Sequence, residues 1–294
     1  MIAQFAWRLI CGMSLMWALM PRKQVTSGFF RIQMLVVMGL GVLAAMSTAM
    51  DAQSAIREAG STVLEANIPS PFVASLPASI TAFTGFLGSA FWTLERRTGA
   101  ARIGFGILLT SMGWIWTLCS SGAGHDGYML YINNTVVKVG IPAISLECHP
   151  ILAFVSEITG AAVVGGAVVG MLLGHWYLTT PTMSIEPLKR LNLALGISGV
   201  LRLVVSAAVV LMLWSGAFNS AETTLALSSV PKSWLGLRWL AGIIGPIVVS
   251  MMVWRILKYR NTQAATGVLF VGVILSFIGD MTAALLLQET KLPL

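Results

Sequence analysis

Charged residues are scarce in this chain of 294 residues. Asp, Glu, Lys and Arg together make up 10% of it, whereas ordinary soluble domains carry about 25%. Hydrophobic residues account for 56%, and the mean hydropathy is +0.84. Too few charges remain to cover a soluble protein of this length. The composition therefore predicts an integral membrane protein.

Cysteine and histidine are also rare. The three cysteines are an odd number at no metal-ligand spacing, which argues against a disulfide framework and against a zinc or iron–sulfur site. The three histidines, predicted to lie in an outer loop or at the membrane surface, make a haem with two axial histidines improbable. The pair Cys148-His149 and the 16 methionines raise a Cu(I) site as an alternative. Most of the methionines, however, recur at helical spacing in apolar runs, which favours packing, so we expect no bound metal.

The sequence also lacks the motifs typical of nucleic-acid binding, nucleotide binding and hydrolase catalysis. The 18 Lys and Arg exceed the 11 acidic residues, but no basic run with interleaved aromatic residues occurs, so we expect no nucleic-acid partner. Most basic residues flank apolar segments, which indicates a topology signal. Nucleotide, zinc-protease and serine-hydrolase motifs are all absent, so no nucleotide cofactor is expected.

Apolar stretches of about 20 residues predict a bundle of about eight transmembrane helices in one domain, residues 1–294. The predicted spans are 2–20, 32–50, 76–94, 101–120, 151–174, 191–214, 237–257 and 264–287. Arg8 within the first run, and the basic residues after rather than before it, favour a spanning helix over a signal peptide. Pro21 and Asp51 are expected to end the first two helices, and Asn261 to begin the last.

Loop charges predict the orientation. The odd-numbered loops are more basic than their neighbours, which places them in the cytoplasm and both termini outside. Tryptophans near the span ends agree with interfacial belts. Two long outer loops remain. Residues 51–75 suggest a short surface helix, and residues 121–150 alternate like a β-hairpin. Such an outer face suits either a docking surface or a plain lid.

Four ionisable residues lie within the predicted spans, all in the middle or outer half: Arg8, Glu157, Arg202 and Asp280. An ionisable group inside the membrane is a functional candidate unless it is paired. Structural ion pairs between helices are one interpretation. The other is a proton-handling site in which Glu157 and Asp280 exchange protons, while Arg8 and Arg202 bind a ligand or tune the carboxylates.

The stretch GMLLGHWYLTTPTM follows the fifth apolar run. We expect Gly174 to reach the inner surface, with Trp176 and Tyr177 in the aromatic belt. His175 would then cap the last carbonyl groups, although an inner-face ligand site at His175 stays open. Upstream, the glycines of 160–170 favour close helix packing over a backbone pressed against a flat cofactor.

The last apolar run, GVLFVGVILSFIGDMTAALLL, carries Gly279-Asp280. This pair resembles the final span of NrfD/DmsC-like membrane anchor subunits of molybdopterin oxidoreductases, but the Arg that follows in that family is absent. The resemblance extends to the eight helices, the outer termini and the length. It implies a bacterial inner-membrane subunit without a resident cofactor, which binds quinone and passes electrons to or from an iron–sulfur partner at the outer face. Glu157 and Asp280 would then handle protons near the quinone head group.

Three functions stay open on the sequence. The first is a quinone-interacting membrane anchor subunit of a respiratory complex, which is not certain to be an enzyme. The second is a proton-coupled transporter of a small solute, suggested by the intramembrane charges and by Pro246, which could break the seventh helix. No inverted repeat supports transport. The third is an assembly subunit without chemistry of its own.

Overall fold

The computed structural model describes residues 2–59, 70–123, 129–132, 135–138, 150–180, 182–214 and 231–290. Within these ranges, eight helical segments are long and apolar enough to cross a membrane. They are α1 (Ile2–Leu19), α2 (Ser27–Ala59), α3 (Pro71–Thr93), α4 (Arg97–Ala123), α5 (Pro150–Thr179), α6 (Glu186–Trp214), the composite of α8 (Lys232–Trp239), η3 (Leu240–Ile244) and α9 (Gly245–Lys258), and α10 (Thr262–Thr290). The chain therefore has the character of a multi-pass helical membrane protein.

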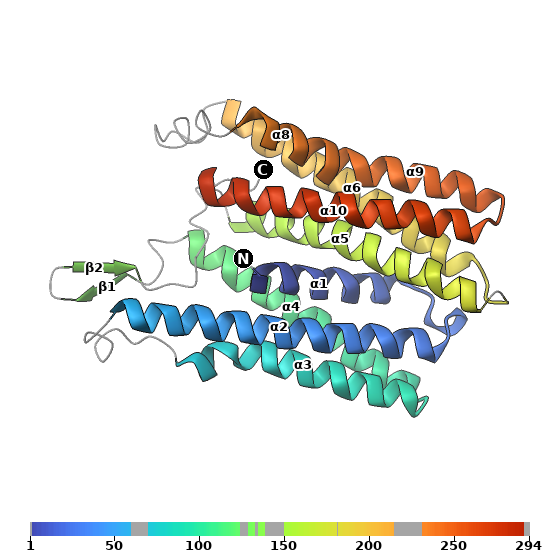
Figure 1. The fold of residues 1–294 in the computed structure, drawn as a ribbon, viewed down its shortest axis with the longest axis horizontal. Coiled ribbons are helices and arrows are strands. Elements are labelled where there is room, and N and C mark those ends of the chain that lie inside the picture. Colours follow the sequence, from blue (N-terminus) through green and yellow to red (C-terminus); the bar gives the residue numbers. More distant parts are fainter. Residues whose placement is uncertain are drawn as a thin grey trace.

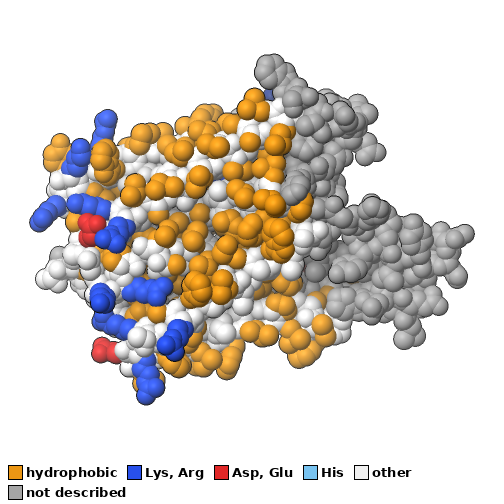
Figure 2. Space-filling model, turned by 180° about the vertical axis from the view of Figure 1, so that it is seen from behind, with side chains coloured by type: hydrophobic (Ala, Val, Ile, Leu, Met, Phe, Trp, Pro, Cys, Tyr) orange, Lys and Arg blue, Asp and Glu red, His pale blue; other side chains and the backbone are white. Residues whose placement is uncertain are grey.

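The helices lie nearly side by side and share two ends (Figure 1). We call the end at which α1 and α5 begin the cluster end, for the charges described below. The opposite end holds the short connections, among them the 3-10 turn η1 (Arg22–Gln24), and we call it the basic end. Figure 2 shows Lys and Arg side chains gathered there, beyond a broad hydrophobic band.

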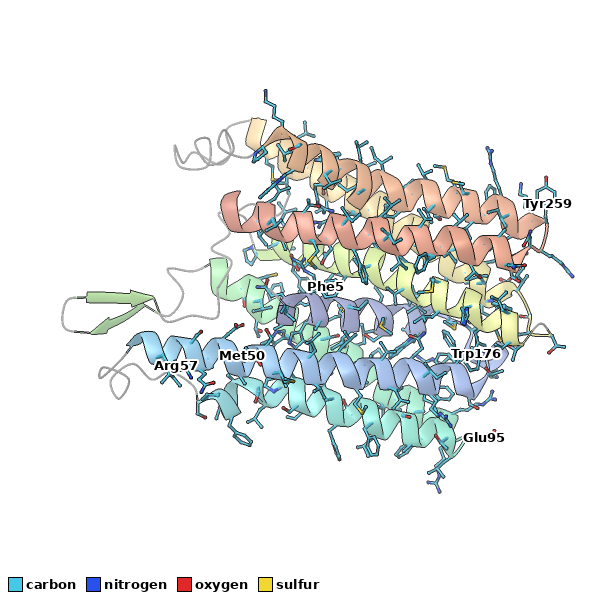
Figure 3. All side chains as sticks on the ribbon, in the orientation of Figure 1. Phe5, Met50, Arg57, Glu95, Trp176 and Tyr259 are labelled. Atoms are coloured by element: carbon cyan, nitrogen blue, oxygen red, sulfur yellow. The ribbon has the colours of Figure 1, made fainter. Side chains whose placement is uncertain are left out.

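Most of the helices extend past their predicted spans, and two of these boundaries bear on the argument below. Asp51 does not end the second helix, which continues to Ala59. The seventh span begins at Lys232 rather than at 237. The polar residues of a terminal helical turn can lie in water outside the bilayer. A helix can therefore extend past the apolar run that spans the membrane. Figure 3 shows Arg57 on this extension of α2, beyond Met50.

Helices α1 and α5 form the centre of the bundle. They are the most buried of the spans, with 67% and 61% of their most apolar windows covered. A Cβ atom added at Gly12 would overlap the Ala161 carbonyl, and one added at Gly165 would overlap the Gly12 backbone. Gly165 of the fifth span therefore serves close helix packing, in agreement with the sequence-based interpretation, whereas a Cβ at Gly160 or Gly170 would make ordinary contacts.

Several tryptophans expected in the interfacial belts are buried instead. Trp7 is stacked on Trp114 with ring centroids 5.4 Å apart, and Trp92 is stacked on Phe30 at 4.5 Å. Trp17 is 3% exposed. These aromatic rings lie inside the bundle because α2, α3 and α4 pack around the ends of α1. Trp254, by contrast, is 59% exposed, as a belt residue should be.

The outer loops are described only in part. Strands β1 (Met129–Ile132) and β2 (Thr135–Lys138) form an antiparallel pair, with Met129 opposite Lys138 and Ile132 opposite Thr135. The surface helix considered for 51–75 falls partly on α2 and α3 and partly on 60–69, which lie outside the described residues.

Candidate functional site

Arg8 lies at the centre of a buried ion-pair network. Its Nε and Nη2 donate to the two carboxylate oxygens of Glu157, and its Nη1 donates to Asp280 Oδ1 at 3.0 Å. Arg8 and Asp280 are each 7% exposed. One guanidinium from α1 thus connects carboxylates from α5 and α10. Three of the four predicted intramembrane charges meet at this point.

Close packing of α1 on α5 positions the first pair. Arg8 lies one helical turn before Gly12, and Glu157 lies one turn before Ala161, which Gly12 contacts. The two helices begin at the same end of the bundle, so both side chains lie on the same side of the crossing. The missing Cβ of Gly12 brings the backbones near enough for the guanidinium to bind both Glu157 oxygens.

Arg202 approaches the same region from α6. Its Nη1 donates to both the backbone carbonyl and the hydroxyl of Ser156, the residue before Glu157. The guanidinium packs on α5 at Gly160, where an added Cβ would lie in ordinary contact, 3.8 Å from the guanidinium carbon. Arg202 is 6% exposed. All four predicted intramembrane charges therefore gather in one place.

Arg238 is a fifth member that the sequence prediction missed. It is 3% exposed, and its Nη1 lies 3.5 Å from the carbonyl oxygen of Gly279, next to Asp280. The predicted span began at 237, which left Arg238 at the membrane surface. The observed helix begins at Lys232 and carries Arg238 nearly two turns inward. The apolar and aromatic residues on both sides of Arg238 in SWLGLRWLAGII are the sequence signal that could have indicated its burial.

A π-helical turn follows Arg238. In η3 the Gly245 N–H donates to the Leu240 carbonyl, and Pro246 comes directly after it at the start of α9. Pro246 has no N–H to donate, so the wider turn takes up the interrupted hydrogen-bond pattern. Gly242 in this turn packs so tightly on Gly279 that a Cβ on either would meet the other backbone. The turn thus holds Arg238 against the Asp280 region.

We call these five residues the charge cluster: Arg8, Glu157, Arg202, Arg238 and Asp280. Both Arg202 and Arg238 interact electrostatically with Glu157 and Asp280. Removal of charges from water costs several kcal/mol per ion, so a buried cluster persists only when opposite charges and hydrogen bonds offset this cost. In this cluster both carboxylates accept hydrogen bonds from Arg8, which offsets part of the cost of their burial.

A narrow hollow reaches the cluster between α1, α4 and α5. It has room for about one water molecule, at ≈ 10 Å³. Its lining comprises Gln4, Trp7, Arg8, Ile115, Leu118, Cys119 and Glu157. The Trp7 indole N–H has no acceptor among the described residues, although Trp7 is only 2% exposed. A buried donor of this kind normally has a partner, so an acceptor that enters the hollow beside Trp7 is a candidate partner for it.

Two buried hydroxyls extend the polar region. Ser206 follows Arg202 by one turn of α6, and Ser276 precedes Asp280 by one turn of α10. Neither hydroxyl has a hydrogen-bond partner within the described ranges, and both residues are at most 2% exposed. Hydroxyls without protein partners at such positions are typical contacts of internal water.

His175 lies far from this cluster. It is exposed near the basic end of α5, 18 residues after Glu157, which is roughly 27 Å along the helix. The helix does not stop at Gly174 but runs to Thr179. Near the observed end of the helix, the Thr179 and Thr180 hydroxyls each donate to the Trp176 carbonyl at 2.9 Å.

Tyr177 is not a belt residue either. It is 3% exposed, and its hydroxyl donates to the Ser184 carbonyl in the connection to α6. Trp176 does lie near the surface, and its indole N–H donates to Thr26 at 2.8 Å. The histidine motif therefore fixes a helix end rather than forming part of the charge cluster.

Metal ligands do not converge within the described ranges, where no group of three His, Cys, Asp or Glu side chains could hold an ion. Residues Cys148 and His149 lie outside those ranges. No protein-family model, curated protein sequence or solved structure matches this chain. Function must therefore be argued from the charge cluster itself.

Proposed function

We propose that this chain is a membrane subunit that binds the head group of a quinone beside the charge cluster and exchanges protons with it. The observation that carries the proposal is the position of Arg8, which holds Glu157 and Asp280 at once and also lines the hollow next to Trp7. A purely structural ion pair needs neither a second carboxylate nor an adjoining hollow.

The chemistry matches these groups. Reduction of a quinone consumes two electrons and two protons and yields a quinol, and oxidation reverses this balance. In quinol oxidation Glu157 and Asp280 can each accept one of the two protons that are released, and in quinone reduction each must first take up a proton from water before it supplies one, while Arg8 stabilises each group in its ionised form. The electrons must come from, or go to, an iron–sulfur partner subunit. The Trp7 N–H can donate to a quinone oxygen, and Ile115 and Leu118 offer apolar contacts to the ring.

The hollow beside Arg8 and Trp7 is too small to hold a quinone ring in this structure. The hollow has room for about one water molecule, which is enough for proton exchange but not for a ring. Entry of a quinone therefore requires movement of α4 relative to α1 and α5. Of the spans, α4 is the least covered, with 28% of its most apolar window buried, so it is the helix whose displacement breaks the fewest contacts.

The proposed function also fixes the orientation of the bundle in the membrane. With the basic end in the cytoplasm, as the positive-inside rule predicts, the charge cluster lies in the outer half of the bilayer, near an outer partner. We expect a cysteine introduced at exposed Ser54 to react with a membrane-impermeant maleimide added outside intact cells. A cysteine at Lys258 should react only after lysis. Both variants should carry Cys148→Ser, and the reverse labelling pattern would contradict the orientation.

Quinone binding is tested by extraction and by titration of the purified protein together with its native partners. We expect the wild-type complex to retain quinone, and Glu157→Gln and Asp280→Asn to lower quinone-coupled turnover by about 10²-fold or more, the typical contribution of a positioned proton donor. Glu186→Gln, which removes an exposed carboxylate, is the matched control. Full turnover in both cluster variants would exclude these residues from proton handling.

The alternative is a proton-coupled solute transporter. The π-helical turn at Leu240–Ile244 and Pro246 support it, because interrupted helices beside buried charges are common at transport sites. Proteoliposomes with an imposed proton gradient test it directly. Uptake or proton flux that disappears in Asp280→Asn would favour transport. If the protein neither retains quinone nor produces flux, it is an assembly subunit without chemistry.

A further inference from the structure

A second hollow, which at ≈ 10 Å³ has room for about one water molecule or one oxygen atom of a larger group, lies at the basic end, between the end of α1 and the adjoining parts of α2, α3 and α4. Trp17, Arg22, Phe30, Trp92 and Phe105 are among its lining residues. Trp17 follows Arg8 by nine residues in α1, or roughly 14 Å along the helix axis. This site is therefore separate from the charge cluster and does not depend on the function proposed there.

Two of the residues that line this hollow carry buried indole donors without acceptors among the described residues. Trp17 and Trp92 are 3% and 2% exposed, and neither Nε1 has a hydrogen-bond partner among the described residues. Burial of an N–H group without an acceptor costs about 1–3 kcal/mol. One such donor could be an isolated defect. Because both rings line the same hollow, an occupant that brings oxygen atoms is favoured over a purely apolar one.

Arg22 supplies positive charge at the same place. Its Nε lies 3.5 Å from the Trp17 carbonyl, which holds the guanidinium over the end of α1. Lys23, Arg97 and Arg102, all exposed, belong to the segments on either side. An occupant with negative charge is favoured here over a neutral one.

The rim of the hollow is apolar and faces outward. Ala18 is exposed, and Phe105 is 51% exposed on a span that crosses the membrane. Side chains at such positions contact acyl chains. The occupant must therefore combine acyl chains, ester or phosphate oxygens and a negative charge, a combination that belongs to membrane lipids rather than to soluble anions.

We propose that this hollow is a specific binding site for an anionic phospholipid. Its phosphate lies against Arg22, its ester or phosphate oxygens accept hydrogen bonds from the Trp17 and Trp92 indoles, and an acyl chain runs along Ala18 and Phe105. Bound lipid would join α1 to α3 and α4 at the basic end.

Native mass spectrometry of the delipidated full-length protein tests this site. The protein is titrated with phosphatidylglycerol and, separately, with phosphatidylcholine. We expect a tightly retained phosphatidylglycerol in the wild type, about tenfold weaker retention in Arg22→Gln, and about fivefold weaker retention in the double variant Trp17→Phe/Trp92→Phe. The controls Lys23→Gln and Trp254→Phe remove an exposed cation and an exposed indole, and should bind as the wild type does.

Thermal unfolding separates lost binding from misfolding. Added phosphatidylglycerol should raise the melting temperature of the wild type and of both controls, but not that of Arg22→Gln, whose melting temperature without lipid should equal that of the wild type. Equal retention of the two lipids by the wild type would overturn the proposal. So would unchanged retention in Arg22→Gln and the indole variant, or a high-resolution structure with only water between the two indoles.

Discussion

Charged side chains are buried and paired between helices at the cluster end of the bundle, whereas at the basic end they are exposed to solvent. At the cluster end, Arg8, Arg202, Arg238 and Asp280 are 3–7% exposed and are held by hydrogen bonds from several helices. At the basic end, the pair Arg190–Glu186 joins neighbouring turns of one helix at 3.3 Å, with side chains 54% and 47% exposed. Similar chemical groups thus have different surroundings.

The difference shows that location, rather than residue type, sets the energetic role of a charge. In water an ion pair gains little, since solvent already stabilises each partner. Inside the bundle each charge relies on its partner, so loss of one leaves the other uncompensated. Substitutions at matched positions can measure this contrast.

Loss of Arg8 should have the largest effect. Arg8→Gln leaves Glu157 and Asp280 without their shared cation, and we expect the free energy of unfolding to fall by about 3–5 kcal/mol. Arg190→Gln at the exposed pair should cost about 0.5 kcal/mol or less. Unfolding of both variants by SDS in mixed micelles, followed by circular dichroism, provides the comparison. Equal losses would mean that burial does not distinguish the two pairs.

The helix crossing beneath the charge cluster should be the next most sensitive place. Gly165→Ala forces a methyl group onto the Gly12 backbone, and overpacking of this kind costs about 1–3 kcal/mol. A Cβ at Gly106 of α4 has no atom within 4 Å, so Gly106→Ala should be neutral or slightly stabilising. The same unfolding assay compares them, and an unaffected Gly165→Ala would show that α1 and α5 can separate freely.

The two carboxylates should not be equivalent. Glu157 accepts two hydrogen bonds from Arg8, whereas Asp280 accepts one. Glu157→Gln should therefore lower the free energy of unfolding by about 1 kcal/mol more than Asp280→Asn does. If Asp280→Asn lowers the free energy of unfolding more than Glu157→Gln does, the interaction of Asp280 with Arg238 next to the π-helical turn contributes more than the second hydrogen bond from Arg8 to Glu157.

An exposed contact between a cation and an aromatic ring at the basic end should give a small effect. The Lys258 ammonium lies 4.6 Å from the ring centroid of Trp254, which is 59% exposed. Lys258→Gln should cost about 0.5–1 kcal/mol. Unlike the loss in Arg8→Gln, this loss should shrink at high salt, because exposed charges are screened. A loss as large as that of Arg8→Gln would remove the contrast between the two ends.

Much of the architecture could be predicted from local sequence. The eight apolar segments appear as spanning helices, and the low charge content identified the membrane environment. Boundaries were less predictable, as Asp51 and Lys232 illustrate, because a helix continues wherever its polar residues reach water. Arg238 was missed for this reason: its placement depended on where the seventh helix begins.

The candidate site was only half predictable. The sequence singled out Arg8, Glu157, Arg202 and Asp280 because charges inside apolar runs are costly, but it left their partners open. His175 was selected for its aromatic neighbours and lies at the other end of α5. Trp7, Trp17 and Trp92 were assigned to the surface, since hydropathy does not distinguish a ring that faces lipid from one that faces another helix.

The sequence by itself determined that this chain is a helical membrane protein with rare charges at membrane depth, because length and polarity act on each segment separately. Only the tertiary structure decided that Arg8 joins Glu157 to Asp280, that Arg238 lies beside them, and that two indoles lack acceptors in one hollow. These are contacts between helices distant along the chain. They depend on which faces meet at Gly12, Gly165, Gly242 and Gly279, where the absence of a side chain sets the approach of the backbones.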